Sequence, residues 1–329
     1  MQNGTRGRER ARSARQQHAV TRTARVVSAV CIASSAAALL AIPATVAGCA
    51  SSRSTGVAGR RVFSALLPRS FVRRVADPRG GSMWAGVIPN TDVPAARRPS
   101  AIYLPPAVSR RRRYPLVILL HGFRGSPYGY VYGLRFAQIA DREIGAHRVP
   151  PFIAIMPAAG ESVRYNGEWA GVWERFVVHD VLSWANRHLP VRRGRAARTI
   201  GGDSAGGYGA VDITLRHPSV FGTAESWSGY FVPIADGPLE GAPQRTLQAH
   251  DPTLLVLRKS ATLRRLGTRF FLSAGRYDRI VARHTRAFAR ELRRLGIAER
   301  LVVMRGGHNG GFWRAQLPAA LAYALHPAS

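Results

Sequence analysis

The sequence predicts an α/β fold with a mostly parallel central sheet that is covered by helices on both faces. Short, continuous apolar runs such as Leu116–Leu120 and Phe152–Met156 are typical of strands that are buried on both faces. Amphipathic segments such as Trp173–Leu189, with apolar residues mostly three and four positions apart, alternate with these runs. A strand, a helix and a further strand in succession favour parallel pairing, because the helix returns the chain to the starting edge of the sheet.

From Tyr114 onward the predicted elements follow one another in a regular order. Strands are predicted at Leu116–Leu120, Phe152–Met156, Arg198–Gly201, Thr223–Ser228, Arg269–Ser273 and Arg300–Met304. Helices are predicted at Trp173–Leu189, Ala205–Arg216, Pro252–Leu266, Ile280–Leu295 and Trp313–Leu325. His217-Pro218 ends the second of these helices, and Gly296 caps the fourth.

Composition limits the classes of protein to consider. The chain has 329 residues, of which 46% are hydrophobic, so it can bury one sizeable core and is neither collagen-like nor fully disordered. Basic residues exceed acidic ones by 48 to 18, a net charge of +30, and all basic residues but Lys259 are arginines spread along the chain. This charge favours anionic surfaces such as phospholipid or cell-envelope polymers. No nucleic-acid recognition motif accompanies it, so a nucleic-acid partner is not expected.

The N-terminus has the pattern of an export signal, predicted over residues 1–48. Residues 1–25 carry seven arginines, and no charged residue occurs from Val26 to Ala47. The segment Val46-Ala47-Gly48-Cys49 resembles the lipobox of bacterial lipoproteins, which implies lipidation of Cys49. Cleavage after Ala47 and an uncleaved membrane span are the alternatives. Each places the following domain outside the cytoplasm, either anchored at the bacterial cell membrane or secreted.

The rest of the chain divides into a tether and one domain. Residues 49–60 are rich in small and polar residues and predict a flexible tether, and residues 61–329 predict one catalytic domain. Residues 61–113 are broken by prolines and arginines and end in Arg110–Arg113, which is interpreted as a solvated loop. Cys31 would leave with the signal, so the exported part keeps only Cys49 and has no internal disulfide.

A nucleophile motif lies between a predicted strand and a predicted helix. Gly202-Asp203-Ser204-Ala205-Gly206 fits the pattern G-x-S-x-G, in which small residues permit a sharp turn around a strained serine. The N-terminus of the following helix directs backbone N–H groups toward a developing oxyanion. We therefore predict Ser204 as the nucleophile. The alternative is that Ser204 caps a glycine-rich turn.

A serine nucleophile needs a base and an orienting acid. His308 follows a predicted strand in the glycine-rich sequence GGHNGG, and Asp278 also follows a strand; the two are predicted as base and acid. The other histidines after Ser204 occur at a helix end, in an arginine-rich helix, or in polar or terminal sequence: His217, His250, His284 and His326. Asp236 and Asp251 do not follow a convincing strand, and Asp278 has the alternative role of a helix cap.

The oxyanion hole requires two donors. The backbone N–H of Ala205 is predicted as one, and the N–H of Phe123, in the turn after Leu116–Leu120, as the other. His121 is expected only to hold this turn by hydrogen bonds. No residue cluster has metal-ligand spacing, so neither a metal nor a cofactor is expected. Four tryptophans are expected in the core or the acyl pocket: Trp169, Trp173, Trp227 and Trp313.

Several motifs together resemble the esterase D-like family of α/β-hydrolases. They are HGFRGSPY, WERFVVHDVLSW, GGDSAGGYGAV, SWSGYF, and SAGRYD with GGHNGGFW, within roughly residues 100–326. This family includes S-formylglutathione hydrolases, feruloyl esterases and the antigen 85 mycolyltransferases. The resemblance implies the α/β-hydrolase fold, the triad Ser204, Asp278 and His308, and Phe123 and Ala205 as oxyanion donors. GDSAG also resembles hormone-sensitive-lipase-like enzymes, but these carry HGGG where this chain has HGFRG.

The expected function is that of an exported serine esterase, which hydrolyses a small-molecule or lipid carboxylic ester through an acyl-enzyme. Acyl transfer to a cell-envelope acceptor is the first alternative, because the same triad would serve it. A non-catalytic envelope-binding protein built on a hydrolase fold is the second.

Overall fold

The computed structural model describes residues 66–92, 99–160 and 167–326. The predicted export signal over residues 1–48, the lipidation residue Cys49 and the tether over residues 49–60 lie outside the described residues. No helix in the described ranges is long and apolar enough to cross a membrane.

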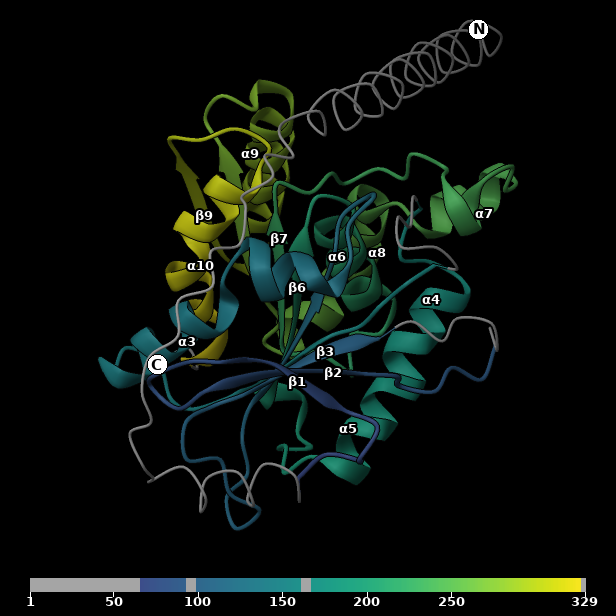
Figure 1. Ribbon diagram of the computed structural model, residues 1–329. Helices are drawn as coiled ribbons and strands as arrows, with labels where there is room; N and C mark the ends of the chain where they lie inside the picture. Colours follow the sequence, from purple (N-terminus) through teal and green to yellow (C-terminus); the bar gives the residue numbers. More distant parts are fainter. Residues whose placement is uncertain (1–65, 93–98, 161–166, 327–329) are drawn as a thin grey trace, which may run out of the picture.

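The described residues form a sheet of nine strands in the order β1-β2-β3-β5-β4-β6-β7-β8-β9 (Figure 1). The strands are β1 Val72–Ala76, β2 Ser82–Gly86, β3 Ser100–Leu104, β4 Leu116–Leu120, β5 Ile153–Met156, β6 Arg198–Asp203, β7 Thr223–Trp227, β8 Arg269–Gly275 and β9 Ala298–Met304. From β5 through β4 to β9 every pairing is parallel, whereas β1, β2 and β3 pair antiparallel and β3 joins β5 antiparallel. The prediction of a mostly parallel central sheet is confirmed.

The three antiparallel strands precede the first strand predicted from the sequence. β1 reads VRRVA and is largely exposed, because it is the edge strand of the sheet. β3 reads SAIYL and is fully buried, but prolines and arginines surround it in the sequence. An exposed edge strand needs no apolar run, so the pattern that found the parallel strands could not find β1.

The helices follow the predicted order closely. α6 Ala205–Arg216, α8 Pro252–Arg265, α9 Arg279–Arg294 and α10 Gly310–Leu325 lie where helices were predicted. The predicted helix Trp173–Leu189 is a continuous helical path whose middle turns are a π-helix: α4 Val172–Arg175, η2 Phe176–Val181 and α5 Leu182–His188. The π-helix η1 Gly129–Gly133, the helices α3 Phe136–Gly145 and α7 Gln244–Ala249, and two short 3₁₀ turns, η3 Arg195–Ala197 and η4 Gly237–Leu239, were not predicted.

Helices cover both faces of the sheet, as predicted. Val117 and Leu119 of β4 pack in one cluster with apolar residues of α3 and α10. Leu116 and Ile118, the alternate residues of the same strand, pack in another with residues of α5 and α6. α8 and α9 pack beside α6 around Phe270 of β8. With both faces covered, the loops at the carboxyl ends of the parallel strands are left to build a site.

Candidate active site

Ser204 lies at a strained turn between β6 and α6. Its backbone has φ +53° and ψ −119°, a region that residues with a side chain rarely adopt. A Cβ atom on Gly206 would lie 1.8 Å from the carbonyl oxygen of Leu120, and one on Gly202 would lie 2.3 Å from the same oxygen. Glycine is therefore required on both sides of the serine, because the end of β4 presses against the turn. Ser204 makes no capping hydrogen bond with its side chain, which argues against the alternative role as a helix cap.

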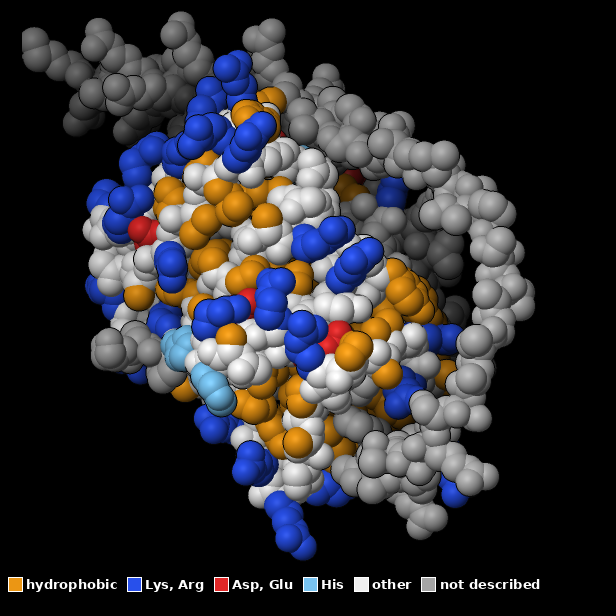
Figure 2. Space-filling view, turned by 60° about the vertical axis from the view of Figure 1, so that its left-hand side comes forward, with side chains coloured by type: hydrophobic (Ala, Val, Ile, Leu, Met, Phe, Trp, Pro, Cys, Tyr) orange, Lys and Arg blue, Asp and Glu red, His pale blue; other side chains and the backbone are white. Residues whose placement is uncertain are grey.

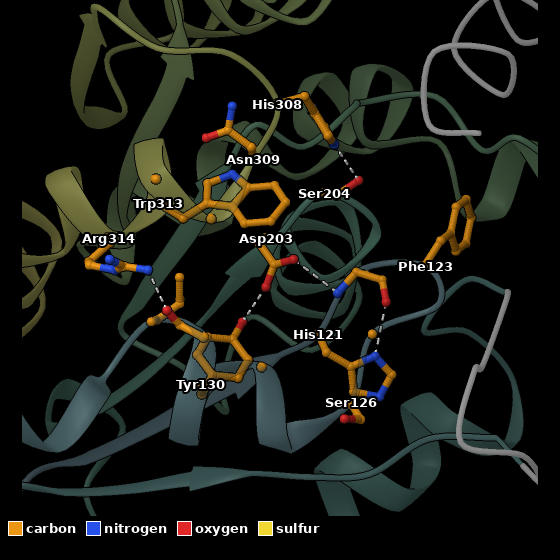
Figure 3. Close-up of a pocket in the computed structure, with 17 residues that line it drawn as sticks. His121, Phe123, Ser126, Tyr130, Asp203, Ser204, His308, Asn309, Trp313 and Arg314 are labelled. Atoms are coloured by element: carbon orange, nitrogen blue, oxygen red, sulfur yellow. Dashed lines mark hydrogen bonds between the residues drawn. The ribbon is translucent and has the colours of Figure 1, made fainter. Parts of the chain in front are cut away.

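Three loops bring Ser204, His308 and Asp278 together at the carboxyl edge of the sheet. Figure 3 shows the contact between His308 and Ser204. His308 Nε2 lies 2.9 Å from Ser204 Oγ, and His308 Nδ1 lies 2.6 Å from Asp278 Oδ2. An ionised carboxylate can only accept, so Nδ1 carries the proton and Nε2 is left to accept from the serine hydroxyl. Asp278 occupies the N-cap position of α9 but makes no capping hydrogen bond with its side chain.

Three of the rival residues, His217, His326 and Asp251, have other partners. His217 Nε2 lies 2.7 Å from Glu174, and His326 Nε2 donates to the carbonyl oxygen of Arg148 at 2.7 Å. Asp251 accepts from the Thr253 and Leu254 amides and caps α8. Burial, followed by the charge of Arg283, lowers the pKa of His284 on α9. None of these residues is placed at the serine.

His250 also has another partner, which the sequence did not indicate. The sequence around it is polar, but its side chain is buried, and its Nδ1 lies 2.7 Å from Asp212 Oδ2. Asp212 is a buried residue of α6. The sequence of this mostly apolar helix gave no indication that its carboxylate would pair with a histidine. The molecule therefore contains a second histidine–aspartate pair away from Ser204.

The turn after β4 approaches Ser204 closely enough to supply an oxyanion donor. A Cβ atom on Gly122 would lie 3.0 Å from Ser204 Cβ. His121 holds this turn: its Nε2 accepts from the Ala159 amide at 3.3 Å, and its Nδ1 therefore donates to the Gly122 carbonyl at 3.0 Å. These contacts agree with the predicted loop-holding role of His121.

Asp203 is a residue of the site that the sequence reasoning did not identify. Its Oδ2 accepts from the Gly122 amide at 3.2 Å, and its Oδ1 lies 2.8 Å from the hydroxyl of Tyr130. Burial raises the pKa of Asp203, although the Tyr130 and Gly122 hydrogen bonds and the charge of His308 each lower it in part. The sequence offered one indication of Asp203: it is an acidic residue at the end of a predicted buried strand, directly before the predicted nucleophile. Its partner Tyr130 lies in η1 and had no comparable signal.

These residues face a cavity of about 450 Å³ (Figure 3). Its wall includes Phe123, Tyr130, Trp313 and Arg314. Trp313 packs edge-on against His308 with the ring centroids 5.4 Å apart. The other three predicted tryptophans, Trp169, Trp173 and Trp227, are buried in the core. A hydroxyl, an imidazole with an oriented proton and a cavity at the same edge are the parts needed for acyl transfer.

No group of three or more His, Cys, Asp or Glu side chains within the described ranges could hold a metal ion.

Comparison with known proteins identifies the group to which this architecture belongs. A family model described as "Putative esterase" matches residues 93–324. Esterase Rv1288 of Mycobacterium tuberculosis is 28% identical over 123 residues, which are 36% of this chain and 26% of that protein. The chain therefore spans about a quarter of the length of this relative.

Solved structures share the fold. A ferulic acid esterase superposes with a TM-score of 0.67 at 21% identity, covering 75% of this chain and 98% of that one. An S-formylglutathione hydrolase from Agrobacterium tumefaciens superposes with a TM-score of 0.59 at 17% identity, covering 78% of this chain and 99% of that one. The resemblance stated from the sequence motifs is confirmed.

Proposed function

Because the chain belongs to the esterase family, we propose that it is an exported serine esterase, which hydrolyses carboxylic esters through Ser204, His308 and Asp278. One observation carries the proposal. Hydrogen bonds of 2.9 Å and 2.6 Å join the serine hydroxyl, the imidazole and the carboxylate in a line that opens into a cavity.

The first step forms an acyl-enzyme. Ser204 Oγ attacks the ester carbonyl carbon while its proton passes to His308 Nε2. The tetrahedral intermediate collapses, the bond between the carbonyl carbon and the alkoxy oxygen breaks, and the imidazolium returns the proton to the leaving alcohol. The acyl group is then esterified to Ser204.

The second step repeats the first with water as the nucleophile. His308 takes a proton from water, the hydroxide oxygen bonds to the acyl carbon, and the acid departs as Ser204 regains its proton. Asp278 stabilises the imidazolium in both steps. It also holds the neutral imidazole of His308 in the tautomer with the proton on Nδ1. An acceptor alcohol in place of water would make the same chain an acyltransferase.

The amides of Phe123 and Ala205 are proposed to stabilise the oxyanion. The contact between Gly122 and Ser204 supports this, since Phe123 is the next residue of that turn and Ala205 follows the serine. Removing one donor of this kind typically costs about 3 kcal/mol of transition-state stabilisation.

The enzymatic test is hydrolysis of p-nitrophenyl esters from acetate to palmitate by the full chain. We expect turnover by the wild type and a loss of at least about 10⁴-fold in kcat for Ser204→Ala. Arg286→Gln, an exposed residue of α9, is the control and should leave turnover unchanged. Undiminished turnover by Ser204→Ala would contradict the assignment, and product analysis with glycerol present would identify acyl transfer.

Export is proposed from the sequence of residues 26–49, which lie outside the described residues. We expect mass spectrometry of the N-terminal peptide from the producing bacterium to show diacylglycerol on Cys49. An intact N-terminus in a cytoplasmic fraction would contradict the proposal.

A further inference from the structure

The amino edge of the sheet carries a second hollow, distant from the serine. Its volume is about 320 Å³, and its rim carries the side chains of Arg110, Arg113, Arg187, His188 and Arg193. Arg113 precedes β4, whereas His121 follows it, so the strand separates this hollow from the catalytic edge. Arg187 and His188 end α5, which runs toward the bottom of Figure 1.

The two segments that bear these arginines are fixed against each other by backbone hydrogen bonds. The Tyr114 amide donates to the Pro190 carbonyl at 2.9 Å, and the Arg192 amide donates to the Tyr114 carbonyl at 2.8 Å. These bonds form a parallel bridge between Tyr114 and Val191. The backbone that carries the arginines is anchored in the core by three buried residues: Tyr114, Leu189 and Val191.

The described lining of this hollow is basic and carries no carboxylate. Arg113, Arg187 and Arg193 form no ion pair with a carboxylate in the part of the chain that the structure describes, whereas Arg148 and Arg216 each pair with a glutamate. Arg187 donates to Ser183 and Arg193 to the Asn186 carbonyl, and each guanidinium has five N–H donors, so most of them are left over.

The pKa of His188 is lowered by its surroundings in this hollow. Burial lowers the pKa of His188, and the charges of Arg187 and Arg110 lower it further. Its ring packs against Trp184 with the centroids 4.9 Å apart. A cation-rich hollow that disfavours a further positive charge is one that favours an anion.

We propose that this hollow is a binding site for a phosphate group. Arginine forks bind phosphate oxygens in pairs, and several forks around one hollow suit a group with three or four oxygens better than a single carboxylate. The site does not depend on the esterase proposal. Because it lies at the opposite edge of the sheet, a phosphate-bearing molecule bound there would leave the catalytic cavity uncovered.

General surface charge is the competing explanation, and the experiment must exclude it. Figure 2 shows Lys and Arg side chains dispersed over one whole face with few acidic ones among them. The test variant is Arg113→Gln/Arg187→Gln/Arg193→Gln. The matched control, Arg283→Gln/Arg286→Gln/Arg290→Gln, removes the same charge from exposed positions of α9.

Inorganic phosphate is the first probe, and the NMR titration of His188 in the full chain is the measurement, with His188→Gln used to assign its signal. We expect phosphate to move the His188 titration to higher pH in the wild type and in the control. In the test variant we expect at least about tenfold weaker phosphate affinity. An unmoved titration, or the same phosphate affinity in both triple variants, would overturn the proposal.

Vesicles with and without phosphatidylglycerol form the second arm and distinguish the sources of the phosphate. Vesicle binding lost in the test variant and kept in the control would support the site and assign it to a lipid phosphodiester. Equal vesicle binding by the two variants, with the His188 response still confined to proteins that keep the hollow, would support a site for free phosphate groups.

Discussion

Two histidine–aspartate pairs in this molecule have nearly the same geometry and very different surroundings. In both, a carboxylate Oδ2 meets imidazole Nδ1, at 2.6 Å for Asp278 and His308 and at 2.7 Å for Asp212 and His250. His308 faces the Ser204 hydroxyl and a cavity. His250 is buried, and its backbone carbonyl accepts from the Tyr208 hydroxyl at 2.6 Å.

The difference shows that an oriented imidazole is only one part of a catalytic site. The pair at His308 also has a serine hydroxyl within hydrogen-bond distance and an adjacent cavity. The pair at His250 ties α6 to the loop before α8 inside the core. The first pair should therefore govern turnover, and the second should govern stability.

The largest effects are expected from replacing Asp278 and Asp212 separately by asparagine. Asp278→Asn leaves an acceptor for His308 but no longer fixes the proton on Nδ1, and we expect kcat to fall by about 10⁴-fold. The free energy of unfolding should change little. Steady-state kinetics and urea unfolding of the same preparation check both statements, and full activity in this variant would remove Asp278 from the triad.

Asp203 sharpens the comparison, because it lies beside the catalytic pair without joining it. Asp203→Asn places an amide donor against either the Tyr130 hydroxyl or the Gly122 amide and so weakens the hold on the turn that precedes Phe123. We expect kcat to fall by roughly tenfold, with KM nearly unchanged, because only part of an oxyanion donor's contribution is lost.

Tyr130→Phe is the comparison variant for Asp203→Asn, since it removes the hydroxyl that lies 2.8 Å from both Asp203 Oδ1 and the Leu120 carbonyl oxygen but keeps the carboxyl group and its contact with the Gly122 amide. It should reduce kcat less than Asp203→Asn does. If the two variants behave alike, or if KM alone changes, Asp203 does not position the turn.

Asp212→Asn should have the opposite profile to Asp278→Asn. Asp212 Oδ1 has no hydrogen-bond partner among the described residues, so the new amide would place an unsatisfied donor in the core. We expect the free energy of unfolding to fall by about 1–3 kcal/mol while kcat per folded molecule stays constant. A selective loss of turnover with unchanged stability would show that the second pair has a catalytic role.

The last expected effect concerns the pH dependence of stability and leaves catalysis aside. Burial raises the pKa of Glu168 to about 8, although hydrogen bonds from the Ile234 amide and the Tyr230 hydroxyl lower it in part. The folded protein then keeps a proton that the unfolded chain releases above pH 4.5, so stability should decrease as pH rises and level off above about pH 8.

Glu168→Gln cannot lose this proton and should flatten that dependence by up to about 1.4 kcal/mol per pH unit. Urea unfolding between pH 5 and pH 9, with Glu240→Gln as the exposed control, measures it. Parallel curves for the wild type and Glu168→Gln would show that Glu168 does not titrate on unfolding.

The sequence predicted the parallel half of the molecule well, since buried parallel strands are continuous apolar runs. It also predicted that Ser204, Asp278 and His308 lie together, because each follows a strand and parallel strands end at one edge of the sheet. The antiparallel strands β1–β3 and the helix α3 were missed. Arginines interrupt the apolar residues of β1, and charged residues interrupt those of α3. β2 and β3 are short apolar segments in a stretch of sequence broken by prolines and arginines. Asp203 and Asp212 are functional or structural only through long-range contacts with Tyr130 and His250, which no local pattern records.

Labelling with a fluorophosphonate tests the central claim most directly, since the reagent phosphonylates a serine only where a base activates it. We predict that one equivalent reacts with the wild type, that peptide mapping places the adduct on Ser204, and that Asp212→Asn reacts equally well once folded. Labelling of Ser204→Ala to the same extent, or an adduct on another residue, would contradict the account.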